Sequence, residues 1–225
     1  MNDVVNAFLL VYAGLFPIVN PVGSAPIFLG LTRYCTEAER HALASQVAAN
    51  SFFLLTVSLF IGSHVLDFFG ITLPVVRVAG GLVVTSFGWR LLSADEAEEK
   101  NAPLPSGTPA RQTDAFYPLT MPLTVGPGSI SVAIAFGSQR PAGAVGTEHL
   151  AFAAAGGLAG LAAIAATVFV SYRFAERIVA ALGERGTNVL VRLSAFILLC
   201  IGIQILWSGA SVLLGDVLGR GAAAG

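Results

Sequence analysis

The sequence predicts an all-α integral membrane protein in which six transmembrane helices form two inverted three-helix repeats, with the first and fourth helices discontinuous. Three observations predict this fold: an apolar composition, six long apolar runs, and a proline pattern that occurs twice. Of the 225 residues, 55% are hydrophobic and 11% are charged, and the mean hydropathy is +0.78. Soluble domains carry about 25% charged residues, so this chain needs a bilayer as its solvent. The net charge of −1 excludes a nucleic-acid-binding protein, which requires a basic face.

The six apolar runs are long enough to cross a bilayer, which takes about 20 mostly apolar residues as a helix. They cover residues 4–32, 42–66, 68–89, 115–139, 150–172 and 193–215. The acidic and Pro/Ser/Gly-rich stretch after the third run is typical of a solvated linker. These features divide the chain into a first repeat at 1–92, a linker at 93–114, a second repeat at 115–215 and a disordered tail at 216–225.

The basic side chains between these runs predict the orientation. Cytoplasmic loops carry the excess of Lys and Arg. The loops after the first, third and fifth runs hold eight such residues, namely Arg33, Arg40, Arg90, Lys100, Arg111, Arg173, Arg177 and Arg185. The opposite side holds only Arg140 and Arg220. We therefore expect the linker in the cytoplasm and both termini in the periplasm.

The proline pattern repeats in the first and fourth runs. Both copies read P-x3-P-x4-P, and the prolines are Pro17, Pro21 and Pro26 in the first copy and Pro118, Pro122 and Pro127 in the second. A repeat of three spans must enter the membrane from the opposite side in its second copy. This is the inverted-repeat arrangement of many secondary transporters.

The proline clusters predict interruptions in these two helices, because each proline removes a backbone donor and disfavours helix at the preceding residue. Non-helical backbone at membrane depth is tolerated where it faces protein or a water-filled cavity. The freed N–H groups suit a carboxylate and the freed carbonyls suit an ammonium group, so the pair suits a small zwitterion. The predicted substrate-binding residues are Asn20, Pro21, Gly23, Ser24, Thr120, Thr124, Gly126, Gly128 and Ser129.

Two arginines lie inside the apolar runs. Arg77 and Arg192 are candidates for gating or for binding a carboxylate, although both lie close enough to a span end to extend to the interface instead. No carboxylate or histidine stands at mid-span, so the coupling ion stays open between a proton and a sodium ion held by carbonyls. We expect no metal site, no cofactor and no enzymatic activity, because the spans lack HExxH and paired mid-span acids.

Three motifs are similar to those of the MarC family of bacterial inner-membrane proteins. They are the Asn-Pro-x-Gly-x-x-Pro segment at 20–26, the Pro-Leu-x-x-Pro-x-x-x-Gly-Pro-Gly-x-Ile segment at 118–130, and the Arg-x-x-Gly-Gly segment at 77–81. The family is also described as six-span neutral amino acid transporters. The resemblance implies transport of small neutral amino acids such as alanine, glycine or serine.

These arguments together predict a secondary transporter that works by alternating access, with its substrate held at the two facing helix breaks. The expected partners are a small-molecule substrate and the lipid bilayer, with no nucleic acid, and a homo-oligomer is left open. The alternatives are a non-transporting membrane scaffold, or a transporter or exporter of another small polar solute.

Overall fold

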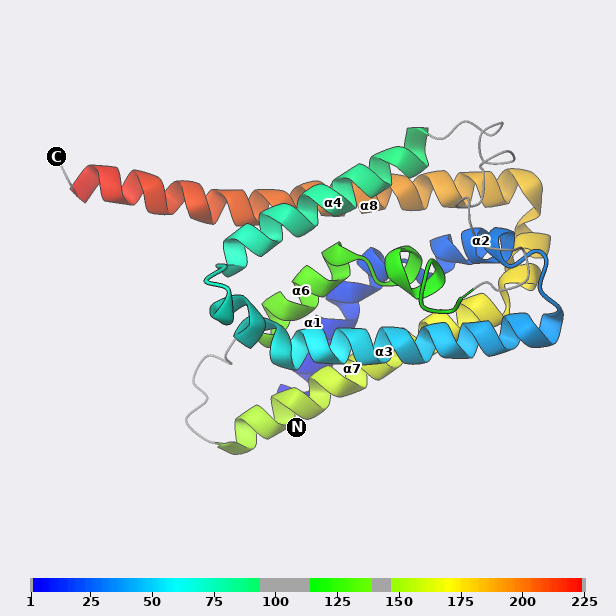
Figure 1. Cartoon of the computed structure of the whole chain (residues 1–225), viewed down its shortest axis with the longest axis horizontal. Coiled ribbons are helices and arrows are strands. Elements are labelled where there is room, and N and C mark those ends of the chain that lie inside the picture. The colour runs from blue at the N-terminus through cyan, green and yellow to red at the C-terminus, as the bar shows by residue number, and fades with distance from the viewer. Residues whose placement is uncertain (1, 94–113, 139–146, 224–225) are drawn as a thin grey trace.

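The computed structural model of this protein describes residues 2–93, 114–138 and 147–223, and within these ranges the chain is helical and contains no strand. Figure 1 shows the arrangement of the helices. In chain order they are α1 (Asn2–Val19), α2 (Pro21–Leu31), α3 (Glu37–Phe68), α4 (Leu73–Ser93), η1 (Leu119–Thr124), α6 (Pro127–Gly137), α7 (Thr147–Arg173) and α8 (Ala175–Ala223). The predicted linker at 93–114 falls almost wholly outside the described residues.

Four described helices are long and apolar enough to cross a bilayer: α3, α4, residues His149–Arg173 of α7, and residues Arg185–Gly215 of α8. Helices α1 and α2 form a fifth candidate, bent by 41° at their junction. The predicted fourth span contains no helix of membrane length, since η1 and α6 have 6 and 11 residues. Both predicted interruptions are therefore present.

Several helix boundaries differ from the apolar runs for local reasons. Helix α3 begins at Glu37, before the run at 42–66, because Thr36 and Glu39 form a reciprocal N-terminal cap. The turn before α4 falls at Gly70, whose φ of 66° suits glycine, so Phe68 ends α3 and does not start the third span. Gly183, also at φ 66°, kinks α8, and α8 continues to Ala223 where a disordered tail was predicted from residue 216.

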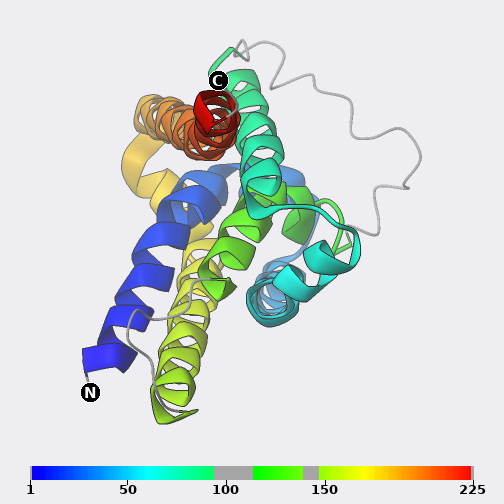
Figure 2. The same cartoon turned by 90° about the vertical axis from the view of Figure 1, so that its left-hand side faces the viewer.

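The helices differ in how they pack. Most buried residues of the hydrophobic core come from α1, α2, α3, η1, α6 and α7. Helices α4 and α8 lie against each other along one side (Figure 1 and Figure 2). Glycines bring this pair together: a Cβ added at Gly81 would lie 2.4 Å from the Leu206 nitrogen, and one at Gly202 would lie 2.5 Å from the Thr85 nitrogen. Close backbone approach at small residues is how helices associate in lipid.

The contacts are exchanged between the two halves of the chain. The first interrupted segment, α1 and α2, packs on α7 and α8, while the second, η1 and α6, packs on α3 and α4. Each half therefore supplies the packing surface for the interrupted segment of the other half. This exchange brings the two interruptions to the middle of the molecule, where they contact each other.

Candidate functional site

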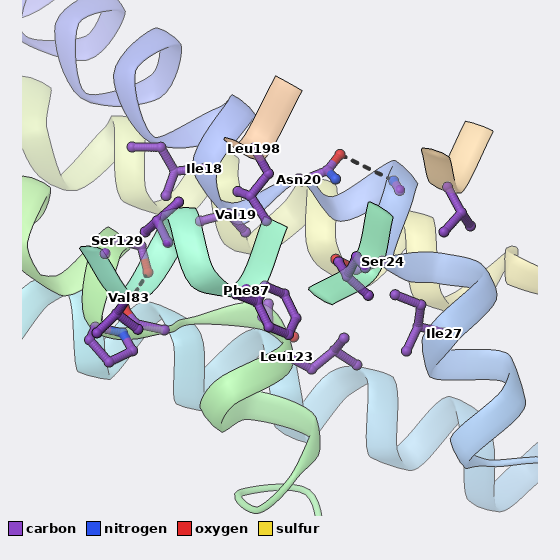
Figure 3. Close-up of a pocket in the computed structure, with 18 residues that line it drawn as sticks. Ile18, Val19, Asn20, Ser24, Ile27, Val83, Phe87, Leu123, Ser129 and Leu198 are labelled. Atoms are coloured by element: carbon purple, nitrogen blue, oxygen red, sulfur yellow. Dashed lines mark hydrogen bonds between the residues drawn. The ribbon is translucent and has the colours of Figure 1, made fainter. Parts of the chain in front are cut away.

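A small cavity of about 80 Å³ lies between the two interruptions. Figure 3 shows Asn20 and Ser24 from the first segment and Leu123 and Ser129 from the second around the same space. Helices α4 and α8 complete the wall with apolar side chains. The lining residues are Ile18, Val19, Asn20, Gly23, Ser24, Ile27, Val83, Val84, Phe87, Leu91, Leu123, Thr124, Gly126, Pro127, Gly128, Ser129, Val191 and Leu198.

Most of the predicted substrate-binding residues line this cavity: Asn20, Gly23, Ser24, Thr124, Gly126, Gly128 and Ser129. Two do not. Pro21 is buried at the first position of α2, where it helps to cause the interruption. The Thr120 hydroxyl donates to the Ala115 carbonyl at 2.7 Å and accepts from the Asn50 amide at 3.4 Å, so it serves η1 and not the cavity. That the lining groups bind a solute stays a prediction.

The first interruption is a single left-handed residue. Asn20 has φ 47° and ψ 55°, and its side-chain oxygen accepts from the Gly23 N–H at 3.3 Å. Asparagine is one of the few residues other than glycine that adopt this conformation readily, because its short side chain bonds locally. The Asn20 side chain therefore caps α2. The sequence predicted that freed N–H groups bind a ligand, but the Gly23 N–H is already bonded to Asn20.

Carbonyl groups are released where α1 ends. The carbonyl of Pro17 loses its usual donor because the residue four positions ahead, Pro21, has no N–H. The carbonyl of Val19 would be paired with Gly23, whose N–H points to Asn20 instead. Val19 lines the cavity, so a carbonyl without its helical donor belongs to a residue beside this space.

The second interruption has a different geometry. Pro118 and Pro122 are four residues apart, so the Pro118 carbonyl cannot pair at helical spacing. The chain widens to a π-helix instead, in which the Leu123 N–H donates to the Pro118 carbonyl at 3.4 Å and the Val125 N–H to the Thr120 carbonyl at 2.8 Å. Widening by one residue restores the bonds that the prolines remove.

Helix α6 begins beside the cavity without a side-chain cap. Gly126 is its N-cap in an extended conformation, and its first backbone bond runs from the Ile130 N–H to the Gly126 carbonyl at 3.1 Å. The N–H groups of Gly128 and Ser129 precede that bond and have no acceptor within the helix. Both residues line the cavity, so the start of α6, with donors unpaired within the helix and the positive end of its dipole, lies beside this space.

The glycines of the site allow close packing of neighbouring helices. A Cβ added at Gly128 would lie 1.8 Å from the Val84 Cγ2 atom of α4. One added at Gly23 would lie 2.3 Å from the Ser194 hydroxyl oxygen of α8. These contacts let α4 and α8 close the cavity wall directly against the two interrupted segments.

Sequence reasoning missed Tyr172, which joins the two interruptions. This fully buried residue ends α7, and its hydroxyl lies 2.7 Å from the Thr124 hydroxyl, with Ser24 as a second hydrogen-bond partner. Its ring stacks on Phe28 of α2 at 4.3 Å between centroids. A tyrosine buried in an otherwise apolar run was the available signal, because a buried hydroxyl needs a polar partner.

Neither arginine chosen from the sequence lines the cavity. Arg77 is partly buried on α4 and lies close to α8. A Cβ added at Gly209 of α8 would lie 2.9 Å from the Cβ of Arg77. Arg192 is exposed on α8. Within the described part of the chain the buried arginine is Arg40, which was predicted to lie in a loop and which forms an ion pair with Glu176. Among the described residues no group of three His, Cys, Asp or Glu side chains could hold a metal ion.

The sequence matches the family described as "MarC family integral membrane protein" over residues 5–214. The chain belongs to the MarC family. Similar proteins include the membrane protein YhcE of Escherichia coli strain K12, 32% identical over 88% of this chain and 89% of its own length. The membrane protein YvbG of Bacillus subtilis strain 168 is 31% identical over 88% and 92%. The inner membrane protein MarC of Escherichia coli strain UTI89 is 31% identical over 93% and 96%.

No solved structure matches this chain. Membership of the MarC family and the apolar helices identify it as a multi-pass integral membrane protein. The family match spans both interruptions and the cavity between them, so the site lies within the part shared with the relatives.

Proposed function

We propose that this MarC-family protein is a secondary transporter of small neutral amino acids in the bacterial inner membrane, with its substrate in the cavity between the two interruptions. The observation that supports this most is the unlike chemistry of the two sides of one cavity. The end of α1 offers carbonyl acceptors, and the start of α6 offers the N–H groups of Gly128 and Ser129. An α-amino acid carries an ammonium group and a carboxylate on one carbon, so it matches both sides together.

The size of the cavity favours a small solute. Sites for drug-sized ligands have volumes of about 300–1,000 Å³, whereas this cavity has about 80 Å³. Its apolar wall, with Val83 and Phe87 from α4, suits a short aliphatic side chain. One similar protein, MarC of Escherichia coli strain UTI89, is an inner membrane protein, which supports the proposed location.

The exchange of contacts between the halves supports the predicted inverted repeat and alternating access. This arrangement has six membrane segments. The first is α1 with α2 and the fourth is η1 with α6, while the other four are the single helices α3, α4, α7 and α8. Movement of α4 and α8, which pack through glycines at one side, relative to the core would open the cavity to each side in turn. The distribution of basic residues among the loops supports a periplasmic position for both termini. Sodium and protons both remain candidates for coupling.

The proposal is tested by uptake of labelled alanine, glycine and serine into proteoliposomes under imposed sodium or proton gradients. Ser129→Leu should fill the cavity and lower uptake by about tenfold or more, the effect of about 1.4 kcal/mol of lost binding. Ser208→Leu is the matched control, because both hydroxyls donate to the carbonyl three residues back, at 2.9 Å and 2.8 Å, and Ser208 does not line the cavity.

Absence of saturable uptake of all three amino acids under either gradient would contradict the transport proposal and favour a scaffold. Saturable uptake of a different small polar solute, inhibited by Ser129→Leu but not by Ser208→Leu, would retain the site and change the substrate.

A further inference from the structure

A second cavity, of about 150 Å³, adjoins Tyr172 where α7 meets α8. Its lining is strongly polar, with Arg40 and His41 from α3, Arg173 from α7, and Glu176 and Arg177 from α8. Tyr172 also lines this second cavity, while its hydroxyl reaches Thr124 and Ser24, which line the central one. Tyr172 therefore links the lining of the second cavity to residues that line the central one.

The Tyr172 hydroxyl is held by a directed bond. The Thr124 hydroxyl donates its single proton to the Leu119 carbonyl at 2.7 Å. The bond between the two hydroxyls, also 2.7 Å, must therefore be donated by Tyr172. The ring is fully buried and stacks on Phe28 with an angle of 13° between the planes. Hydroxyl and ring together bind the end of α7 to both interrupted segments.

A half-buried ion pair lies at the same end of the molecule. Arg40 is 8% exposed and forms an ion pair with Glu176, whose side chain is 55% exposed. The Arg40 guanidinium also donates to the Cys35 carbonyl at 3.1 Å and to the Thr32 carbonyl at 3.4 Å, beyond the end of α2. Arg40 thus ties the end of α2 and the start of α8 to α3.

We propose that Tyr172 is a gate between the central cavity and a polar vestibule, formed by the second cavity, through which the solute reaches the cytoplasm. The closed state is held by the Tyr172–Thr124 bond and the Arg40–Glu176 pair. The inference rests on the proposed transport function, which it extends by assigning the route. Arg33, Arg40, Arg173 and Arg177 are at this end, which makes it the cytoplasmic end by the distribution of positive charge.

The vestibule is suited to a zwitterion because it presents both signs of charge around one space. Arg173 and Arg177 lie over the Phe169 and Phe174 rings, at 5.9 Å and 5.2 Å from their centroids. Opening requires the Tyr172 hydroxyl to leave Thr124, after which the ring can turn away from Phe28. Tyr172→Phe removes the hydroxyl that holds the closed state and keeps the ring, so it isolates the contribution of this one hydrogen bond.

The gate is tested by the rate at which a cysteine in the central cavity reacts with a membrane-impermeant methanethiosulfonate reagent. The reporter is Ser129→Cys in a Cys35→Ala, Cys200→Ala background, which leaves the Cys35 carbonyl in place for Arg40. Reagent is applied from either side, to inside-out and to right-side-out vesicles. Tyr172→Phe should raise the rate from the cytoplasmic side about five-fold, the effect of one lost hydrogen bond.

Tyr12→Phe is the matched control. The Tyr12 hydroxyl also bonds a threonine hydroxyl, Thr167, at 3.3 Å, but it lies outside both cavities. Thr124→Val removes the bond of the gate from its other partner and should reproduce the effect of Tyr172→Phe. All variants are compared as material that elutes as a single species in detergent.

Equal cytoplasmic labelling in Tyr172→Phe and Tyr12→Phe, or labelling that rises from the periplasmic side instead, would overturn the gate. Because the labelling rate is measured without uptake, the two proposals fail separately. A Tyr172-dependent labelling rate without uptake of any amino acid contradicts transport alone, and unchanged labelling in an actively transporting Tyr172→Phe contradicts the gate alone.

Discussion

The two interruptions occupy the same place in the repeated proline pattern but have opposite geometry. Asn20 and Met121 both stand directly before the second proline of their cluster. Asn20 is left-handed, at φ 47° and ψ 55°, whereas Met121 is extended, at φ −117° and ψ 123°. A proline makes helix unfavourable at the residue before it, but that residue decides which other conformation the chain takes. A repeated sequence pattern therefore produces two unlike structures.

The difference gives the two sides of the cavity different chemistry. At the first interruption the backbone bonds continue, from the Asn20 N–H to the Phe16 carbonyl at 2.8 Å and from the Ser24 N–H to the Asn20 carbonyl at 3.0 Å, and Asn20 caps α2. At the second, a π-helical turn precedes a helix without a side-chain cap. The first interruption leaves carbonyl acceptors without helical partners and the second leaves N–H donors without them, which is the difference that a molecule with one cationic and one anionic end requires.

Replacement of Asn20 by valine should show the difference most strongly. A β-branched residue in the left-handed region costs about 1–3 kcal/mol, and loss of the cap costs about 1 kcal/mol more. Met121→Val should cost less than about 1.5 kcal/mol, because valine favours an extended backbone. Thermal unfolding in detergent measures both, and equal decreases in Tm would show that the interruptions do not differ as described.

Gly128→Ala tests the close contact between the second segment and α4. A methyl group 1.8 Å from the Val84 side chain should cost about 1–3 kcal/mol through overpacking. Val84→Ala in the same chain should restore most of the loss in Tm. Gly30→Ala on α2 is the control, because nothing lies within 4 Å of its added methyl group, and it should be neutral or slightly stabilising. Failure of Val84→Ala to rescue would place the strain elsewhere.

Gly126→Asp makes the second interruption resemble the first by adding a cap to α6. Gly126 is already in the extended conformation of an N-cap. The carboxylate should stabilise the helix by about 0.3–1 kcal/mol and occupy the donors proposed for the substrate. We expect a raised Tm together with lost amino acid binding in an equilibrium binding assay. Retained binding with a raised Tm would show that these donors do not hold the carboxylate.

Asn20→Gly should have the smallest effect. Glycine keeps the left-handed backbone and loses only the side-chain bond to Gly23, for a cost of a few tenths of a kcal/mol. Asn20→Asp keeps an acceptor and serves as the control in the same thermal measurement. A loss as large as that of Asn20→Val would mean that the side chain, and not the backbone conformation, determines this interruption.

The sequence predicted the features that depend on neighbouring residues. Proline spacing alone indicates where α1 and the fourth span are interrupted, because the missing donors are a local property. The π-helical turn and the self-capping by Asn20 depend on which alternative pairing the chain finds, and proline spacing does not specify it. Depth in a span suggested Arg77 and Arg192, but the position of a residue along a helix does not say which helix it faces.

Tyr172 shows the limit of sequence reasoning more clearly. Its partner Thr124 is 48 residues away, and the stacking on Phe28 depends on how α7 crosses α2. The Arg40–Glu176 pair likewise joins residues 136 positions apart. Such contacts are set by the exchange of packing surfaces between the two halves, which a single sequence does not reveal.

The central claim is that the two interruptions hold opposite ends of one small zwitterion. Competition against labelled alanine, bound at equilibrium to the purified protein, tests it most directly. Unlabelled alanine should displace the label, while alanine amide and N-acetylalanine, which each lack one charge, should compete at least about tenfold less well. Equal displacement by both blocked analogues, or no saturable binding of alanine, glycine or serine, would contradict the account.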